Sequence, residues 1–294
     1  MPVPLAPEDW SERARRHQAR VDSWTRGHLE RAGAGRRHPV EDFLFRYYPH
    51  RVGQLRRWHP GIGVTLLGDA ARERLAWPSY TERGAGIGVD VESFLSRRGR
   101  RLTSTVALLR ATRSRAPQLG CFGMHEWAMV YRQSEGERRH EDWPLRMGQA
   151  ATDAVVEEQP LRCTHFDAFR FFTPPARPLN VRQPTRPTQV ALEQPGCLHA
   201  SMDLYKYAYQ LVPGVSSDLV GDCFALARDV REVDMRASPY DFSRLGLAPV
   251  AVETSAGRAE YVAYQRSFTD RAQVLRHRLL DVLEPLCAAV SAHP

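Results

Sequence analysis

The sequence predicts a mainly α-helical protein that forms a single compact domain over residues 1–294, with a central antiparallel helix hairpin and at most a few short strands. Three observations support this fold class. Apolar residues recur with a helical period over most of the chain, alternating strand-like runs are scarce, and Pro and Gly separate the helical stretches. With 43% hydrophobic and 26% charged residues, the composition is that of an ordinary globular protein.

The N-terminal part is predicted to consist of helices separated by turns. A long helix is expected over residues 7–32, because apolar residues recur there close to a heptad spacing. A second helix should begin at Pro39, since proline is well placed in a first helical turn. A short helix is expected in residues 51–61. Residues 62–88 should hold short elements and turns, including a flexible loop at 84–88 whose glycine spacing does not fit a dinucleotide-binding motif.

The C-terminal part is predicted to be helical with two short strands. Helical periodicity is found in four stretches: 89–115, 123–132, 147–159 and 257–285. Strands are expected at 161–172, which is rich in aromatic residues, and at 248–254. The six prolines of residues 174–195 indicate an ordered crossing segment or a linker, and not a repeat.

The central hairpin is predicted to consist of helices at 197–212 and 217–236. Pro213 and Gly214 should end the first helix, because proline lacks a donor and glycine tolerates the turn. Ser216 and Ser217 are candidate N-caps of the second helix. A loop this short makes the two helices antiparallel neighbours.

Each hairpin helix carries a narrow polar stripe. At 100° per residue, Asp203, Lys206 and Gln210 lie at about 40°, 340° and 20° from His199, on a helix that is otherwise nearly all apolar. The second stripe contains Asp218, Asp222, Asp229 and Arg236. Mirror pairing across the turn predicts that Lys206 lies near Asp222 and His199 near Asp229. Because buried polar groups need partners, we expect one buried cluster.

This cluster supplies the candidate catalytic residues, which are Lys206, Asp203, Asp222 and His199. Lys206 is the only lysine among the 41 basic residues. A buried lysine can lose its proton and act as a base or nucleophile, whereas arginine keeps its proton. The alternative interpretation is a lysine that only forms an ion pair with Asp203 or Asp222.

A second set of residues indicates a metal site. His165 and Asp167 would share one face of an extended strand, and His199 would complete the two-histidine, one-carboxylate set that holds non-haem iron. His125 and Glu126 form a further histidine–carboxylate pair. If these side chains converge, they should hold one or two ions, iron or manganese being expected. The alternative is that the His-x-Asp spacing arises by chance among eleven histidines.

Charge and aromatic content permit a nucleic-acid partner. The net charge is +7 and the pI about 9.4, with short basic runs at 36–38, 97–101 and 138–140. Tyr205, Tyr209 and Trp127 could stack on a flat substrate, and Arg236 could hold a phosphate or carboxylate. The alternative is that the aromatic residues belong to the core and the basic runs are solvated surface.

Other features exclude several classes of protein. The five cysteines form no CxxC pair, which argues against structural zinc and against a disulfide framework. No apolar run approaches the length of a membrane span, and the N-terminus has no apolar signal core. We therefore expect a cytoplasmic protein that does not enter the membrane.

Several segments resemble proteins of high-GC bacteria that are usually labelled 3-methyladenine DNA glycosylase. These are HPVEDFLFRYYPHRVGQLRRWHPG (38–61), GCFGMHEWAMVYR (120–132), LRCTHFDAFRFFTP (161–174), QPGCLHASMDLYKYAYQL (194–211), LVGDCFALARDVREVDMRASPYD (219–241) and GRAEYVAYQRSF (257–268). The resemblance covers nearly the whole chain. It implies a DNA-repair hydrolase that removes alkylated purines without a required cofactor, and it assigns no catalytic residue.

Three functions therefore stay open. A glycosylase would extrude an alkylated base and use Asp203 or Asp222 to activate water or to stabilise the oxocarbenium ion, with Lys206 orienting the carboxylate or attacking the sugar. A helical oxidoreductase or hydrolase would use a histidine–carboxylate metal site. A non-catalytic binding protein would keep the polar stripe only as a satisfied buried network.

Overall fold

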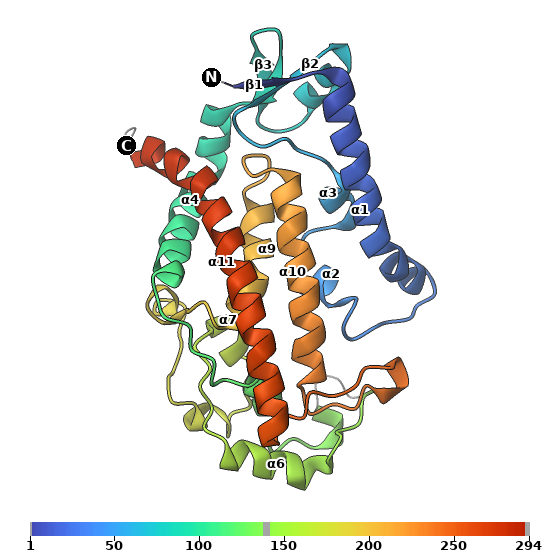
Figure 1. The fold of residues 1–294 in the computed structure, drawn as a ribbon, viewed down its shortest axis with the longest axis vertical. Coiled ribbons are helices and arrows are strands. Elements are labelled where there is room, and N and C mark those ends of the chain that lie inside the picture. Colours follow the sequence, from blue (N-terminus) through green and yellow to red (C-terminus); the bar gives the residue numbers. More distant parts are fainter. Residues whose placement is uncertain (1, 138–141, 292–294) are drawn as a thin grey trace. The chain divides into compact units, whose positions relative to one another are not determined.

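The computed structural model describes residues 2–137 and 142–291 and is mainly helical, which confirms the predicted fold class (Figure 1). The basic run at 138–140 lies outside the described residues. The elements follow in the order β1 (Val3–Leu5), α1 (Pro7–Gly33), α2 (Phe43–Tyr47), α3 (Val52–Arg56), β2 (Val64–Leu67), η1 (Asp69–Ala76), β3 (Tyr80–Arg83), β4 (Gly86–Val89), α4 (Val91–Arg113), α5 (Met124–Ala128), η2 (Glu135–Glu137), α6 (Gly148–Glu158), α7 (Phe166–Phe169), η3 (Arg177–Leu179), α8 (Gln189–Leu192), α9 (Leu198–Gln210), α10 (Ser217–Arg236), η4 (Ser243–Leu245) and α11 (Ser255–Ser291). Among these helices, none is long and apolar enough to cross a membrane.

The chain divides into two compact units, each assembled from separate stretches of sequence. Unit 1 contains residues 1–109, 204–225 and 274–294, and unit 2 contains residues 110–203 and 226–273. Helices α4, α9, α10 and α11 each contribute residues to both units. The candidate site described below is built entirely from residues of unit 2.

Unit 1 contains a four-stranded sheet in the order β1-β2-β4-β3, where the sequence indicated only short elements and turns. Strand β1 is parallel to β2, and the other two pairings are antiparallel. The loop predicted at 84–88 is a tight turn followed by β4. Gly86 is required in β4, because a Cβ atom there would collide with the carbonyl oxygen of Leu66 on β2. These strands were missed because each has only three or four residues.

The central hairpin forms as predicted. Helices α9 and α10 lie side by side and antiparallel, and the Ser216 hydroxyl caps α10 by accepting a hydrogen bond from the Leu219 amide at 3.3 Å (Figure 1). In unit 1 the two helices meet where the Tyr205 ring packs edge-on to the Phe224 ring, with centroids 5.0 Å apart. This contact shows which residues of α9 and α10 lie opposite each other.

Two strands predicted in unit 2 do not form. Residues 161–172 contain only an isolated bridge from Leu161 to Asn180, followed by the single-turn helix α7. Residues 248–254 lead into α11 without joining a sheet. The Pro-rich segment 174–195 carries η3 and α8. Two of the aromatic residues that suggested a strand at 161–172, Phe169 and Phe172, are buried in the core, whereas Phe166 and Phe171 are half-buried.

Candidate metal centre

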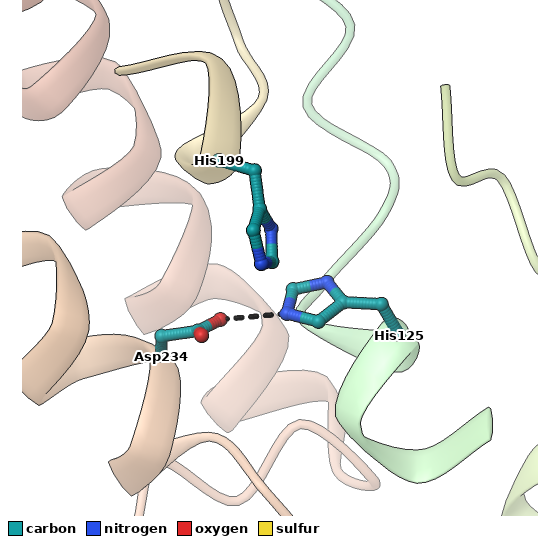
Figure 2. A group of neighbouring side chains, drawn as sticks. All are labelled: His125, His199 and Asp234. Atoms are coloured by element: carbon teal, nitrogen blue, oxygen red, sulfur yellow. Dashed lines mark hydrogen bonds and ion pairs between the residues drawn. The ribbon is translucent and has the colours of Figure 1, made fainter. Parts of the chain in front are cut away.

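Three side chains of unit 2 converge inside the protein. They are His125 on α5, His199 in the first turn of α9 and Asp234 near the end of α10, and Figure 2 shows them pointing toward one another. One potential ligand atom from each lies within 4.8 Å of the other two. All three residues are buried. Two imidazoles and one carboxylate form the ligand set found in mononuclear non-haem iron sites.

His125 is positioned by the way in which α5 begins. Gly123 precedes the helix in the left-handed conformation (φ 70°), which turns the chain so that all five residues of α5 are buried. His125 and Asp234 then lie with Nε2 and Oδ1 only 2.8 Å apart. A residue other than glycine is disfavoured at position 123, because its Cβ would also press against Tyr261 and Ala237 at 3.3–3.4 Å.

Arg231 holds the carboxylate of Asp234 from one helical turn earlier on α10. Its Nη1 donates to Asp234 Oδ2 at 3.2 Å and to Glu126 Oε1 at 3.1 Å. Arg231, Asp234 and Glu126 are all buried, so this contact satisfies charges that water cannot reach. The two carboxylates exceed the single guanidinium by one negative charge, which a proton on His125 balances and a bound cation would balance in its place.

The titration of the site follows the same electrostatics. Burial lowers the pKa of His125, but the charge and the hydrogen bond of Asp234 outweigh this, so that the pKa of His125 is raised overall. Burial raises the pKa of Asp234, but the nearby charges of His125, His199 and Arg231 lower it by more than burial raises it. The net shift of this pKa is downward. Burial, assisted by His125, brings the pKa of His199 well below its usual range. His199 is therefore a neutral imidazole at neutral pH, which is the form that ligates metals.

A second cluster of side chains lies beside this triad. His165 is completely buried, and its Nε2 lies 3.4 Å from Asp203 Oδ2 and 3.6 Å from Glu193 Oε2. The two clusters are adjacent, because the rings of His165 and His199 stack with centroids 5.3 Å apart.

A small pocket borders the triad within unit 2. Both triad histidines line it, together with three thiols and several apolar side chains; its lining includes Cys121, Met124, Leu161, Cys163, Phe172 and Cys197. The free space is about that of one water molecule. Burial raises the pKa of each of the three thiols, so they are protonated at neutral pH.

The structure distributes the predicted metal ligands over different contacts. His125 and His199 lie in the triad, and His165 lies in the neighbouring cluster. Asp167 is on α7 and pairs with Arg186 at 2.7 Å. Glu126 binds Arg231.

The predicted catalytic residues are placed in both units. Asp203 is buried beside His165, whereas Lys206 is half-buried in unit 1 with its Nζ 5.1 Å from the centre of the Tyr207 ring. Asp222 pairs with Arg20 at 2.9 Å and Arg278 at 2.8 Å, all within unit 1.

The predicted pairing of His199 with Asp229 is wrong. Asp229 is exposed and binds Arg271 on α11 instead. His199 lies near Asp234, which is five residues, or about 1.4 turns, farther along α10 than the residue that mirror pairing predicts.

The predicted substrate-binding residues occupy separate places. Tyr205 and Tyr209 are buried in unit 1, with ring centroids 5.0 Å apart. Trp127 is fully buried in unit 2 and donates to the carbonyl of Ala237 at 2.9 Å. Arg236 is half-buried and donates to the carbonyl of Ala248 at 2.8 Å.

Three residues of these clusters were missed from the sequence: Asp234, Arg231 and Glu193. Asp234 lies about 160° around α10 from the stripe that begins at Asp218, so a search along the stripe passes over it. The available signal was the Arg231–Asp234 spacing of three residues, which brings opposite charges together on one face of a helix. Glu193 sits in the Pro-rich segment and has no periodic context.

Comparison with known proteins does not assign the chain to a family. No family model, curated protein or solved structure matches the chain.

Proposed function

We propose that the protein is a metal-dependent enzyme whose ion is held by His125, His199 and Asp234. The observation that carries this proposal is the convergence of two buried imidazoles and a buried carboxylate from three separate helices. A network with only a structural role would be complete with the His125–Asp234 pair. His199, which faces this pair, therefore supports a metal-binding role.

The geometry fits an octahedral ion. Ligands in adjacent positions of an octahedral ion with bonds of about 2.1 Å are about 3 Å apart. The 2.8 Å between His125 Nε2 and Asp234 Oδ1 is close to that separation. Imidazole together with carboxylate suits divalent iron and manganese, which accept six ligands. Three protein ligands would leave positions for water and substrate.

The charge of the site favours water activation. A divalent ion added to Arg231, Asp234 and Glu126 gives a net charge of one positive unit, which a bound hydroxide would neutralise. A bound cation lowers the pKa of water strongly and so supplies a nucleophile at neutral pH. Hydrolysis is therefore the reaction class that we propose, and the pocket that both histidines line has room for the one water molecule that would be the nucleophile.

The experiment is elemental analysis of the purified full-length chain. The expected result is bound iron or manganese that His199→Ala greatly reduces. The matched control is His277→Ala, which removes an exposed histidine of α11 and should leave the metal content unchanged. Equal metal loss in both variants, or metal-free protein after growth with added iron and manganese, would refute the proposal. Iron with oxygen-dependent turnover would instead indicate an oxidoreductase at the same ligands.

The resemblance supplies a second proposal, a DNA glycosylase for alkylated purines. It is supported by exposed arginines that follow one another on α4: Arg97, Arg98, Arg100 and Arg101. Contacts with phosphates predict a DNA affinity that falls steeply with salt. The test is release of 3-methyladenine from alkylated DNA, together with borohydride trapping in wild type and Lys206→Arg. A trapped adduct that disappears in the variant would establish the lysine as nucleophile, and absence of both base release and DNA affinity would remove this proposal.

A further inference from the structure

The hydroxyl of Tyr261 is a buried polar group without a hydrogen-bond partner among the residues that the structure describes. Tyr261 lies on α11 within unit 2 and is 0% exposed. Its hydroxyl makes no hydrogen bond with any described residue. Buried hydroxyls are usually paired, because an unpaired one costs free energy. The Tyr261 hydroxyl is therefore available to a bound species.

This hydroxyl lies between the segments that carry His125 and Asp234. A Cβ atom on Gly123, two residues before His125, would be 3.3 Å from the hydroxyl oxygen and 3.4 Å from the Cβ of Ala237. Ala237 comes three residues after Asp234. The oxygen is thus placed where the start of α5 meets the end of α10, the two helices from which His125 and Asp234 project toward each other in Figure 2.

The same face of α11 contacts the wall of the pocket beside the triad. Gln265 lies about one turn after Tyr261 and is also buried. Its Nε2 donates to the carbonyl of Gly196 at 2.9 Å and to Cys121 Sγ at 3.3 Å. Cys121 lines the pocket together with both histidines of the triad. Because residues four apart share a helix face, Tyr261 projects from α11 on the side of the pocket.

The hydroxyl keeps its proton at neutral pH. Burial raises the pKa of Tyr261 well above its usual range, and Cys121, Asp234, Cys197 and Glu126 raise this pKa further. A protonated phenol donates a hydrogen bond. Asp234 belongs to the triad and the two cysteines line its pocket, so this donor lies among the groups of the proposed centre.

We infer that the Tyr261 hydroxyl donates a hydrogen bond to the hydroxide bound to the ion of the triad. This inference rests on the proposed function, which supplies the ion. Three protein ligands leave positions for water on the ion, and the pocket has room for one water molecule. A bound hydroxide is an acceptor for the phenol. In return, a fixed neutral donor stabilises the anion and orients it for attack on a substrate.

The experiment uses fluoride as the probe, because fluoride has the charge and nearly the size of hydroxide and only accepts hydrogen bonds. Chelator-treated full-length protein is loaded with Mn(II), its metal content is measured by elemental analysis, and fluoride binding is followed by fluorine NMR relaxation, which bound Mn(II) accelerates. We expect Tyr261→Phe to hold as much Mn(II) as wild type and to bind fluoride about 10-fold more weakly, because a hydrogen bond to an anion is lost.

The matched control is Tyr264→Phe, which removes another hydroxyl of α11. The Tyr264 hydroxyl accepts a hydrogen bond from Arg236 Nη1 at 3.4 Å, and Tyr264 is half-buried. This variant should keep the Mn(II) content and the fluoride affinity of wild type.

Thermal unfolding of the chelator-treated protein gives an independent readout. An unpaired buried hydroxyl destabilises the folded state, so Tyr261→Phe should leave the unfolding midpoint unchanged or raise it. A lower midpoint would show that the hydroxyl has a structural partner within the chain, and it would overturn the inference.

The remaining outcomes separate this inference from the proposed function. Equal fluoride affinity in wild type and Tyr261→Phe at equal Mn(II) content, or wild type that binds Mn(II) but no fluoride, would overturn the role of Tyr261 and keep the metal site. Loss of Mn(II) from Tyr261→Phe would also overturn that role, because the hydroxyl would then support the ion or its ligands instead of the hydroxide. Wild type that binds no Mn(II) would overturn the proposed function, and this inference with it.

Discussion

Asp234 links two parts of the proposed centre, because it contacts both His125 and Arg231. Its two carboxylate oxygens are divided between them, with Oδ1 facing His125 and Oδ2 facing Arg231. The amide of asparagine would keep the shape of this side chain and remove its charge. A substitution at this position therefore separates charge from packing.

We predict that Asp234→Asn weakens Mn(II) binding at the triad by more than the 10–100-fold that typically follows loss of an outer-shell partner. The reason is that a neutral amide is a poor ligand beside a buried guanidinium. Isothermal titration of the chelator-treated protein measures the change. Asp229→Asn is the matched control, because it alters an exposed aspartate of the same helix that binds Arg271. Unchanged affinity in Asp234→Asn would contradict the assigned ligand.

Arg231 provides a second prediction for single residues. We expect Arg231→Met to lower the free energy of unfolding by about 3–5 kcal/mol, because removing one partner of a buried ion pair leaves the others uncompensated. Asp234 and Glu126 are the groups that would be left. Urea denaturation measures the loss, and adding Mn(II) should restore part of it because ligand binding stabilises the folded state. A loss below about 1 kcal/mol would show that the network does not need the guanidinium.

Residue types alone indicated part of this centre. The sequence marked His125 and His199 as metal ligands, because histidines near carboxylates have that chemistry. It could not select Asp234, because the partner of His199 depends on where α10 lies against α9. Mirror pairing across a hairpin places partners only approximately, and five residues, or about 1.4 helical turns, separate Asp229 from Asp234.

Helix positions within the chain were predicted better than strands. The bounds of α1, α9 and α10 agree with the periodicity to within a few residues, since long amphipathic patterns are strong signals. The sheet was missed because strands of three or four residues carry too little pattern. The two predicted strands of unit 2 failed because aromatic residues pack equally well in an irregular core.

The start of α5 provides a test at the level of a whole element. We predict that Gly123→Ala weakens metal binding as well as stability, because an L-residue pays about 1–2 kcal/mol in the left-handed conformation and its Cβ would push against Tyr261. Gly246→Ala is the control: Gly246 has nearly the same φ, 71°, but nothing lies within 4 Å of its Cβ position.

In thermal unfolding, the backbone strain of a left-handed alanine should lower the stability of both variants by a similar amount. Only Gly123→Ala should also lose affinity for Mn(II), since only that substitution displaces the helix that carries His125. Equal affinities in the two variants would argue that α5 does not position a ligand.

The acid sensitivity of the molecule follows from its neutral buried histidines. Burial lowers the pKa of His50 to about 4 and that of His59 to about 3. In the unfolded chain a histidine titrates near pH 6.5, so below that pH the unfolded state binds protons that the folded state does not. Stability should therefore fall as the pH decreases from 6.5 to about 4.

We predict that each of these histidines contributes about 1.4 kcal/mol of this loss for each pH unit. His50→Phe keeps a ring to stack on Tyr209, which His50 contacts with centroids 4.4 Å apart, and removes the titrating group. Urea unfolding at pH 6.5, 5.5 and 4.5 should show a slope shallower by about that amount than in wild type. The raised pKa of His125 does not oppose this slope, because His125 is protonated in both states below pH 6.5. Identical slopes for the two proteins would contradict the prediction.

The most direct test of the proposed centre is anomalous diffraction from crystals of the full-length protein grown with Mn(II), recorded at the manganese absorption edge. We predict an anomalous peak about 2.1–2.3 Å from a ring nitrogen of His125, a ring nitrogen of His199 and a carboxylate oxygen of Asp234. A map without a peak at these residues, in which His125 remains hydrogen-bonded to Asp234 at 2.8 Å, would contradict the central claim.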